Sequence, residues 1–202
     1  MSELRADLAA IADAVPMGAR VLDVGCGNGA LLAVLRASKK VDGRGIELSG
    51  ANVAAAVARG LSVVQGDADA DLADYPTDAF DVAILSDTLQ AMRAPATVIA
   101  ELLRIARRAV VSFPNFGHWR VRLSLFAGGR MPVTATLPVP WYETPNIHLC
   151  SIDDFRVLAT DLGLTVERAI FLNNGRSIGP LAANLRAEQA IFVLSRNDRE
   201  SS

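Results

Sequence analysis

The chain has 202 residues, of which 51% are hydrophobic, and its formal net charge at pH 7 is −2. This length suits one domain with a sizeable core, and the composition excludes a disordered chain and gives no sign of a nucleic-acid partner. No apolar run approaches the roughly 20 residues that span a bilayer, and the N-terminus lacks the apolar core of a signal peptide. We therefore expect a soluble, cytoplasmic protein without membrane contact, built as a single domain over residues 1–202.

The cysteines and histidines are too few and too scattered to form a metal site. Cys26 and Cys150 lie far apart in the sequence, which indicates free thiols in a reducing compartment. Together with the two histidines they show none of the spacings of known metal sites, so we predict no metal.

Strands and helices are predicted to alternate along the first half of the chain. Leu4, Leu8, Ile11 and Val15 recur at helical spacing, which predicts an amphipathic helix that ends before Pro16. Apolar runs then predict strands at about 20–24, 43–47, 61–65, 80–86 and 109–113, with helices beginning near residues 30, 49 and 95.

The C-terminal part is predicted to contain one helix and two more strands. Ser151 and Asp154 have the spacing of a capping box for a helix that ends near Gly163. Strands follow at about 164–172 and 190–195. The alternation as a whole predicts a doubly wound, mostly parallel sheet that binds ligands at the carboxyl ends of its strands.

The run 21–32 combines a buried strand, a glycine-rich turn and the start of an apolar helix. Gly25, Gly27 and Gly29 allow a tight turn and leave no side chain between backbone and ligand, and the helix N–H groups favour a negative group. A carboxylate at Asp23 would repel phosphates but attract the ammonium group of S-adenosylmethionine. The run therefore resembles the first motif of class I methyltransferases; the alternative is a glycine turn that only packs helix against strand.

Acidic side chains follow the next strands at the edge where a nucleoside would lie. Glu47 comes 18 residues after Gly29, near the spacing at which an acid accepts hydrogen bonds from ribose hydroxyls. Asp67 can accept from an adenine amino group, with the backbone N–H of Ala68 serving a ring nitrogen. Ser86 ends the fourth strand and faces the same crevice. For Glu47 the alternative is an acid that is simply solvated at a strand end.

Residues 114–150, an aromatic insert after the fifth strand, do not fit a plain parallel unit, in which a short loop leads to a helix. Residues 113–148 contain both histidines, both tryptophans and six of the eleven aromatics, and residues 102–142 contain no acid. Aromatics combined with arginine are typical of interface hot spots. We expect a lid or a docking surface on the cofactor side; the alternative is extra core over the sheet.

Several runs resemble the MetW family of methionine biosynthesis proteins over nearly the whole chain. They are Leu-Gln-Ala-Met at 89–92, Phe-Pro-Asn-Phe-Gly-His-Trp at 113–119, Arg-Met-Pro-Val at 130–133 and Trp-Tyr-x-Thr-Pro-Asn-Ile-His at 141–148. The resemblance implies a Rossmann-like class I methyltransferase fold, with a seven-stranded, mostly parallel sheet and an antiparallel C-terminal hairpin. It also implies a role in methionine synthesis as a partner or activator of a MetX-type homoserine O-acyltransferase. The chain lacks the Asn-Pro-Pro-Tyr type of motif found in enzymes that methylate nucleic-acid amino groups.

The resemblance to the methyltransferase superfamily also implies a cofactor site for S-adenosylmethionine or S-adenosylhomocysteine. Asp23 and the three loop glycines would hold the methionyl part. Glu47 would bind the ribose and Asp67 the adenine.

Two functions remain open at this stage. In the first, the protein is a partner or activating subunit of the acyltransferase, and its aromatic insert signals whether the cofactor is bound. The candidate partner-binding residues are Phe116, Trp119, Arg120, Trp141 and Tyr142. In the second, the protein methylates a small molecule, with His118 or His148 as general base. The alternative for both histidines is a structural role in fixing the insert by hydrogen bonds.

Overall fold

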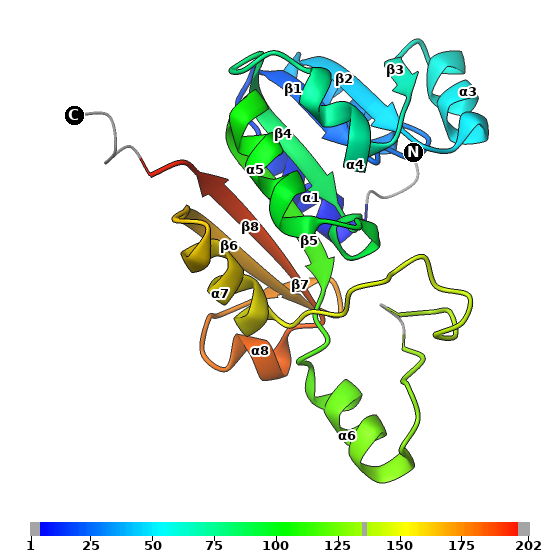
Figure 1. Cartoon of the computed structure of the whole chain (residues 1–202), viewed down its shortest axis with the longest axis vertical. Coiled ribbons are helices and arrows are strands. Elements are labelled where there is room, and N and C mark those ends of the chain that lie inside the picture. The colour runs from blue at the N-terminus through cyan, green and yellow to red at the C-terminus, as the bar shows by residue number, and fades with distance from the viewer. Residues whose placement is uncertain (1–4, 135–136, 198–202) are drawn as a thin grey trace.

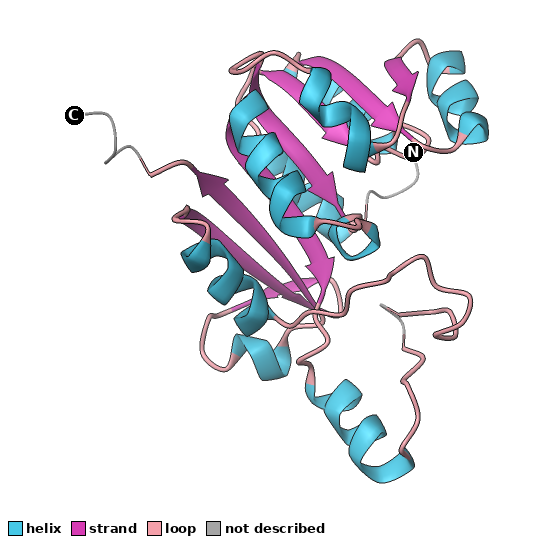
Figure 2. Ribbon diagram, viewed as in Figure 1, coloured by secondary structure: helices cyan, strands magenta, loops and turns pink. Residues whose placement is uncertain are grey.

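A computed structural model describes residues 5–134 and 137–197, which form one eight-stranded sheet with helices on both faces (Figures 1 and 2). The strand order is β3-β2-β1-β4-β5-β8-β6-β7. The strands are β1 (Arg20–Val24), β2 (Asp42–Glu47), β3 (Ser62–Gln65), β4 (Phe80–Ser86), β5 (Ala106–Pro114), β6 (Thr165–Asn173), β7 (Arg176–Ile178) and β8 (Gln189–Ser195). Strands β1 to β5 pair in parallel, and β8, β6 and β7 pair antiparallel.

The helices cover both faces because the central strands are buried on both sides. Val82 and Ile84 of β4 belong to one core cluster with α1 and α2, whereas Ala83 and Leu85 belong to another with α5. The helical elements are α1 (Ala6–Ala14), α2 (Ala30–Lys39), α3 (Gly50–Ala58), α4 (Ala68–Asp71), η1 (Leu72–Asp74), η2 (Leu89–Ala91), α5 (Pro95–Ile105), α6 (Trp119–Gly128), α7 (Ile152–Asp161) and α8 (Ala183–Arg186).

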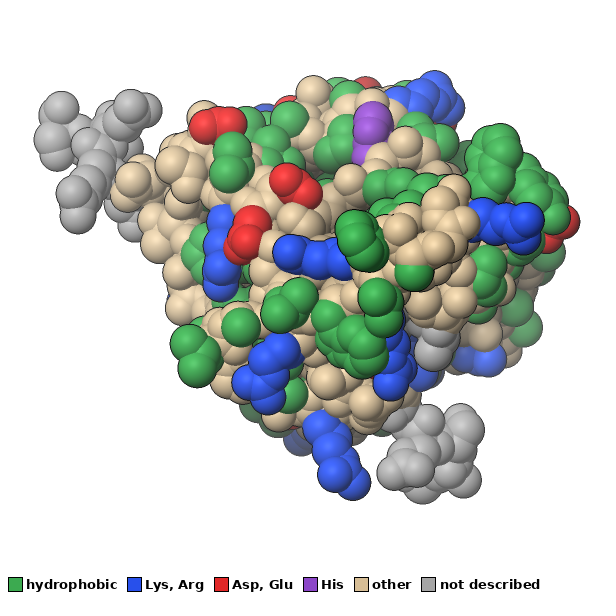
Figure 3. All heavy atoms as spheres, turned by 90° about the horizontal axis from the view of Figure 1, so that it is seen from below, with side chains coloured by type: hydrophobic (Ala, Val, Ile, Leu, Met, Phe, Trp, Pro, Cys, Tyr) green, Lys and Arg blue, Asp and Glu red, His purple; other side chains and the backbone are tan. Residues whose placement is uncertain are grey.

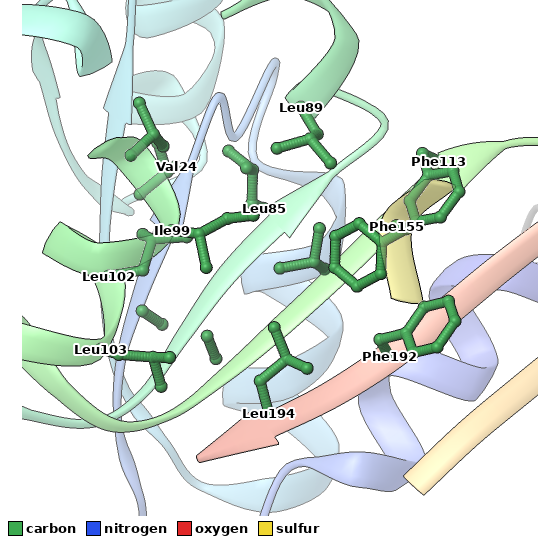
Figure 4. Close-up of a cluster of buried hydrophobic side chains, with 14 of the residues drawn as sticks. Val24, Leu85, Leu89, Ile99, Leu102, Leu103, Phe113, Phe155, Phe192 and Leu194 are labelled. Carbon is green, nitrogen blue, oxygen red and sulfur yellow. The ribbon is translucent and has the colours of Figure 1, made fainter. Parts of the chain in front are cut away.

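An aromatic cluster joins the parallel part of the sheet to its antiparallel end (Figure 4). The Phe155 ring of α7 lies with its centroid 4.8 Å from that of Phe113 and 4.6 Å from that of Phe192. The three side chains belong to β5, α7 and β8, and all are buried. Such pairs contribute about 0.5–1.5 kcal/mol beyond the area that they bury. The cluster therefore packs α7 and β8 against β5.

The predicted elements are confirmed, with one strand more than expected. The capping box of Ser151 and Asp154 is present at the start of α7. The eighth strand, β7, pairs with β6 across a two-residue turn at Asn174 and Gly175, both of which have positive φ. Asn-Gly is the preferred sequence of a type I′ hairpin turn, so the sequence already carried the signal for this strand.

The aromatic insert contains a helix that the sequence analysis did not expect. The backbone of β5 ends at Pro114, and α6 begins at Trp119 after a short turn. Helix α6 projects away from the body of the sheet, and an irregular segment returns from it to α7 (Figure 1). Most of its side chains are exposed and only Val121 is buried, so the helix has no apolar face that packs against the core. The usual helical period was therefore absent from its sequence.

Candidate functional site

The glycine loop leaves the end of β1 through three residues with positive φ. The φ values are 69° at Gly25, 55° at Gly27 and 74° at Gly29. A Cβ atom on Gly25 would lie 2.6 Å from the Thr88 hydroxyl oxygen, and one on Gly29 would overlap the Leu61 side chain. A Cβ atom on Gly27, by contrast, would have no heavy atom within 4 Å. The loop is thus closely packed at Gly25 and Gly29 and open at Gly27.

Asp23 is a buried carboxyl group without a partner. Its side chain is 2% exposed, and no hydrogen bond within residues 5–134 and 137–197 reaches it. Burial, together with the nearby charge of Glu47, raises the pKa of Asp23 to about 7. Buried polar groups are nearly always paired, and a proton or a cationic group would remove the cost of the unpaired charge here.

Glu47 connects the end of β2 to the glycine loop. Its Oε2 accepts a hydrogen bond from the Gly27 N–H at 2.9 Å. Its Oε1 accepts from the Ser49 N–H at 2.9 Å and from the Asn52 side-chain amide at 3.3 Å. A carboxylate has about four acceptor positions, so capacity for a ribose hydroxyl remains.

These residues surround a crevice of about 250 Å³ at the carboxyl ends of β1, β2 and β4. We call it the glycine-loop crevice. Its wall contains four predicted site residues, Gly25, Glu47, Asp67 and Ala68. It also contains residues that the sequence analysis missed, namely Ile46, Leu48, Gly66, Asp87, Thr88, Ala91, Met92, Pro145 and Asn146. Asp23, Gly27, Gly29 and Ser86 adjoin or support the crevice rather than line it.

Two of the predicted acids and hydroxyls already have protein partners. Asp67 caps α4 by accepting from the Asp69 N–H at 3.0 Å, and it forms an ion pair with Arg93 at 2.9 Å. The Ser86 hydroxyl accepts from that of Ser112 at 3.3 Å. The residue that turns into the crevice is its neighbour, Asp87, which has a φ of 54°.

Both histidines lie outside the wall of the glycine-loop crevice in the described part of the chain. His118 is 4% exposed and caps α6, where its Nδ1 accepts from the Arg120 N–H at 3.4 Å. Its Nε2 has no hydrogen-bond partner among the described residues, and burial lowers its pKa. His148 is exposed, and its Nε2 lies 3.3 Å from the Arg93 carbonyl oxygen. His118 thus caps a helix within the insert, and His148 contacts the backbone just after η2.

The returning part of the insert is fixed to η2 by Gln90, which is 1% exposed. The Gln90 carbonyl oxygen accepts from the N–H groups of Ile147 at 2.8 Å and His148 at 2.9 Å. Its side-chain amide donates to the Pro114 carbonyl at 3.0 Å, and its Oε1 accepts from the Asn146 amide at 3.4 Å. These contacts bring Asn146 to the crevice from 56 residues further along the chain.

The outer side of the insert forms an apolar groove of about 640 Å³. Among its lining residues are Phe116, Trp141, Pro145 and Asn146, so the last two belong to both the groove and the crevice. The Trp141 side chain is 70% exposed and meets Tyr142 edge-on. Hydrophobic side chains and arginine or lysine side chains are interspersed over this end of the molecule (Figure 3).

Helix α6 adds further apolar surface beside the groove. Phe126 is 91% exposed, and Trp119 is 45% exposed with the Arg120 guanidinium 5.4 Å from its ring centroid. Arg120 also lies 3.6 Å from Glu188. Large exposed apolar patches on soluble proteins usually mark binding surfaces.

Within the described residues, no group of three or more His, Cys, Asp or Glu side chains is arranged to hold a metal ion. None of the described helices has the length and apolar character to cross a membrane.

Comparison with known proteins gives matches over almost the whole chain. The family model of the methionine biosynthesis protein MetW matches residues 5–194. The bifunctional methionine biosynthesis protein MetXA/MetW of Rhodopirellula baltica is 33% identical over 208 residues, which cover 97% of this chain and 33% of that protein. The chain thus spans about a third of the length of this curated relative.

Solved structures of methyltransferases share the fold. An S-adenosylmethionine-dependent methyltransferase from Mesorhizobium loti gives a TM-score of 0.71 at 18% identity, with 95% of this chain and 98% of that chain covered. A chain in the complex between the Haloferax volcanii Trm112 methyltransferase activator and the putative methyltransferase gives 0.68 at 19% identity, with 95% and 89% covered. At this level of identity, the matches establish the Rossmann-like methyltransferase fold.

Proposed function

Because the chain belongs to the family of the methionine biosynthesis protein MetW, we propose that it is a cofactor-binding partner subunit of a MetX-type homoserine O-acyltransferase. The cofactor is S-adenosylmethionine or S-adenosylhomocysteine. The observation that carries the proposal is the shared wall: Pro145 and Asn146 line both the glycine-loop crevice and the apolar groove. A ligand in the crevice therefore touches the same segment as a protein in the groove.

The residues of the crevice fit the nucleoside part of this cofactor. Glu47 would accept hydrogen bonds from ribose hydroxyls, and Asp67 with the Ala68 N–H would recognise adenine. Leu48 and Met92 supply apolar surface for the faces of the base. Asp23 and the open side of Gly27 would serve the positively charged end. When bound, the cofactor supplies an activated methyl group or, after demethylation, none.

The apolar groove and α6 fit the role of a docking surface. Trp141, Tyr142 and Phe116 offer large apolar area at one site, and Trp119 with Arg120 extends it onto α6. Aromatic and arginine side chains are the commonest hot spots of protein interfaces. The relative from Rhodopirellula baltica combines MetXA and MetW in one bifunctional protein, which supports an acyltransferase as the partner.

Methyl transfer to a small molecule has less support. The two histidines that could act as general base lie outside the crevice wall in the described residues. His118→Ala or His148→Ala should abolish a methylated product if the protein is a catalyst. In a partner subunit, these changes should be mild unless they disturb the insert.

The proposal is tested by size-exclusion chromatography of this chain with its cognate acyltransferase, combined with an acyl-transfer assay with and without cofactor. We expect co-elution and altered acyl transfer. Trp141→Ala should weaken the complex by about 2 kcal/mol, the size of a hot-spot residue. Met17→Ala is the matched control. Met17 is 63% exposed, but it lies before the start of β1, at the end of the sheet opposite to the carboxyl ends of the parallel strands. Separate elution with unchanged activity would refute the proposal.

A further inference from the structure

A further cavity, of about 640 Å³, lies at the end of the sheet opposite to the glycine-loop crevice. Its wall includes the turn before β4, the amino ends of β4, β5 and β6, and the carboxyl end of β8. Because β8 runs antiparallel to β5 (Figure 1), its last residue, Ser195, lies beside Arg108. Neither the sequence motifs nor the proposed function uses this end of the molecule.

The charged side chains of this wall form ion pairs that leave most arginine N–H groups unused. They are Arg107, Arg108, Arg196, Asp78, Asp81 and Glu167, and we call the space the arginine cavity. Nε of Arg108 lies 2.9 Å from the Glu167 carboxylate. Nη2 of Arg196 donates to Asp78 at 2.6 Å. Each pair occupies one nitrogen of the guanidinium group, so the other two nitrogens of Arg108 and of Arg196 have no acceptor among the described residues.

Arg107 supplies a positive charge that no carboxylate of its own neutralises. The Asp81 carboxylate accepts from Nη2 of Arg20 at 3.0 Å and from the Arg20 backbone N–H at 2.9 Å. These hydrogen bonds lower the pKa of Asp81, and the charge of Arg107 lowers it further. Within residues 5–134 and 137–197, no hydrogen bond or ion pair reaches the Arg107 side chain. Four arginines, the three of the wall and Arg20, thus face three carboxylates, and one positive charge remains.

Two irregular backbone positions place the carboxylates that hold the neighbouring arginines. Asp78 has a φ of 54°, and its N–H donates to the Arg104 carbonyl oxygen at 3.0 Å. The register of β6 against β8 shifts between Val166 and Arg168, which makes Glu167 the extra residue of a β-bulge. Bulges redirect side chains and are frequent next to active sites. An arginine side chain that a carboxylate already holds loses less conformational freedom when a ligand binds.

We propose that the arginine cavity binds a small molecule through a phosphate or carboxylate group. Arg107 neutralises the anion, because its charge is the one in excess. The unused N–H groups of Arg108 and Arg196 and the Ser195 hydroxyl add hydrogen bonds. The planar fork of a guanidinium group matches two oxygens of either anion. No aromatic side chain is among the described residues of the wall, so a nucleobase finds no ring to stack on, and the ligand is a small oxyanion.

Isothermal titration calorimetry of the full chain tests the site with two probes, pyrophosphate for phosphate groups and tricarballylate for carboxylate groups. Arg107→Gln should weaken binding of the preferred probe about tenfold or more, the loss expected for hydrogen bonds to a charged group. Arg107→Lys keeps the charge without the fork and should restore part of the affinity. Arg176→Gln is the matched control, because Arg176 is also an exposed strand arginine but lies on β7, outside the cavity wall. The thermal midpoint of each variant checks its fold.

The glycine loop could also attract an anion, because the N–H groups at the start of α2 favour negative charge. Titration in the presence of S-adenosylhomocysteine separates the two places. We expect the probe to bind equally well with and without it, because the cavity and the crevice lie at opposite ends of the sheet. A probe that S-adenosylhomocysteine displaces, and that Arg107→Gln binds as tightly as the wild type does, would lie at the glycine loop and overturn the inference.

The two probes also identify the source of the oxyanion. Tighter binding of pyrophosphate indicates a phosphorylated ligand, and tighter binding of tricarballylate indicates a carboxylate. The inference is overturned if neither probe binds. It is equally overturned if Arg107→Gln and Arg176→Gln weaken binding by the same factor, which would indicate a general attraction between charges. The comparison of these two variants decides the inference even if S-adenosylhomocysteine does not bind, so the cofactor proposal can fail independently.

Discussion

Asp23 makes the stability of the protein depend on pH in the sense opposite to that of an ordinary paired carboxylate. Its pKa is about 7 in the folded chain, whereas an unfolded aspartate has a pKa near 3.9. The folded state therefore binds the proton more tightly, and its stability falls as the pH rises from about 4 to about 7. Above that range the contribution is constant. The loss measures how strongly the site disfavours an uncompensated charge.

We expect Asp23→Asn to gain stability relative to wild type as the pH rises from about 5 to about 8, by about 1–3 kcal/mol. The amide cannot ionise, so the variant escapes the penalty that the wild type acquires in this range. Urea unfolding at both pH values measures the difference. Asp81→Asn is the control, because Arg20 lowers the pKa of Asp81 and its carboxylate stabilises the fold. A difference that is independent of pH in Asp23→Asn would contradict the prediction.

Alanine substitutions at two positions of the glycine loop should separate an effect on stability from an effect on ligand binding. Both Gly27 and Gly29 have positive φ, so alanine costs about 1 kcal/mol at either from backbone strain alone. At Gly29 the new methyl group also overlaps Leu61, whereas at Gly27 it enters open space. Gly27→Ala should therefore keep a thermal midpoint near that of the wild type yet lose affinity for S-adenosylhomocysteine, and Gly29→Ala should be clearly less stable. Calorimetry with thermal unfolding tests both; unchanged affinity in Gly27→Ala would show that the ligand approaches elsewhere.

At the scale of elements, η2 and the insert act as one unit because Gln90 joins them. The substitution Gln90→Ala removes the donor to the Pro114 carbonyl and the acceptor of the Asn146 amide. These are buried partners, so we expect a cost of about 1–3 kcal/mol. Amide hydrogen exchange should become faster over residues 145–150, with the central strands unaffected. Gln65→Ala, at an exposed glutamine that donates to the Leu48 carbonyl, should leave that segment unchanged.

The elements that the sequence predicted are those with a local signal. The apolar run of β4 and the capping box of Ser151 and Asp154 are patterns of residues that lie close together in the sequence, and the structure contains both. The glycine loop and Glu47 were also recognisable, because a strained turn and a strand-end acid have fixed spacing. The contact between Gln90 and Asn146 joins residues 56 positions apart, and no local pattern encodes it. Thr88 and Met92 also line the crevice, and no local pattern predicted them there.

At the scale of the whole molecule, the strand order decides where these parts meet. The order reverses between β1 and β4, which opens a crevice at the carboxyl ends of the parallel strands. Because β5 is also parallel, the insert that follows it emerges at this same edge. Helix α1 reaches the edge from the other side and brings Arg5 and Asp7. The crevice, the apolar groove and a polar cavity of about 420 Å³ that Arg5, Asp7 and Asp87 line are therefore neighbours, and Asn146 lies in the wall of all three.

A shared wall makes binding at the crevice and at the groove interdependent. If S-adenosylhomocysteine changes the affinity for the acyltransferase by some factor, the acyltransferase must change the affinity for S-adenosylhomocysteine by the same factor. Couplings of this kind are about 1–3 kcal/mol, or roughly 5- to 150-fold. Titrations of each ligand with and without the other measure both factors. We expect Gln90→Ala to bring both close to one while each ligand still binds alone, because the substitution removes the contacts that fix the shared wall but leaves the other lining residues of both sites in place. If neither ligand changes the affinity of the wild type for the other, the two sites are independent.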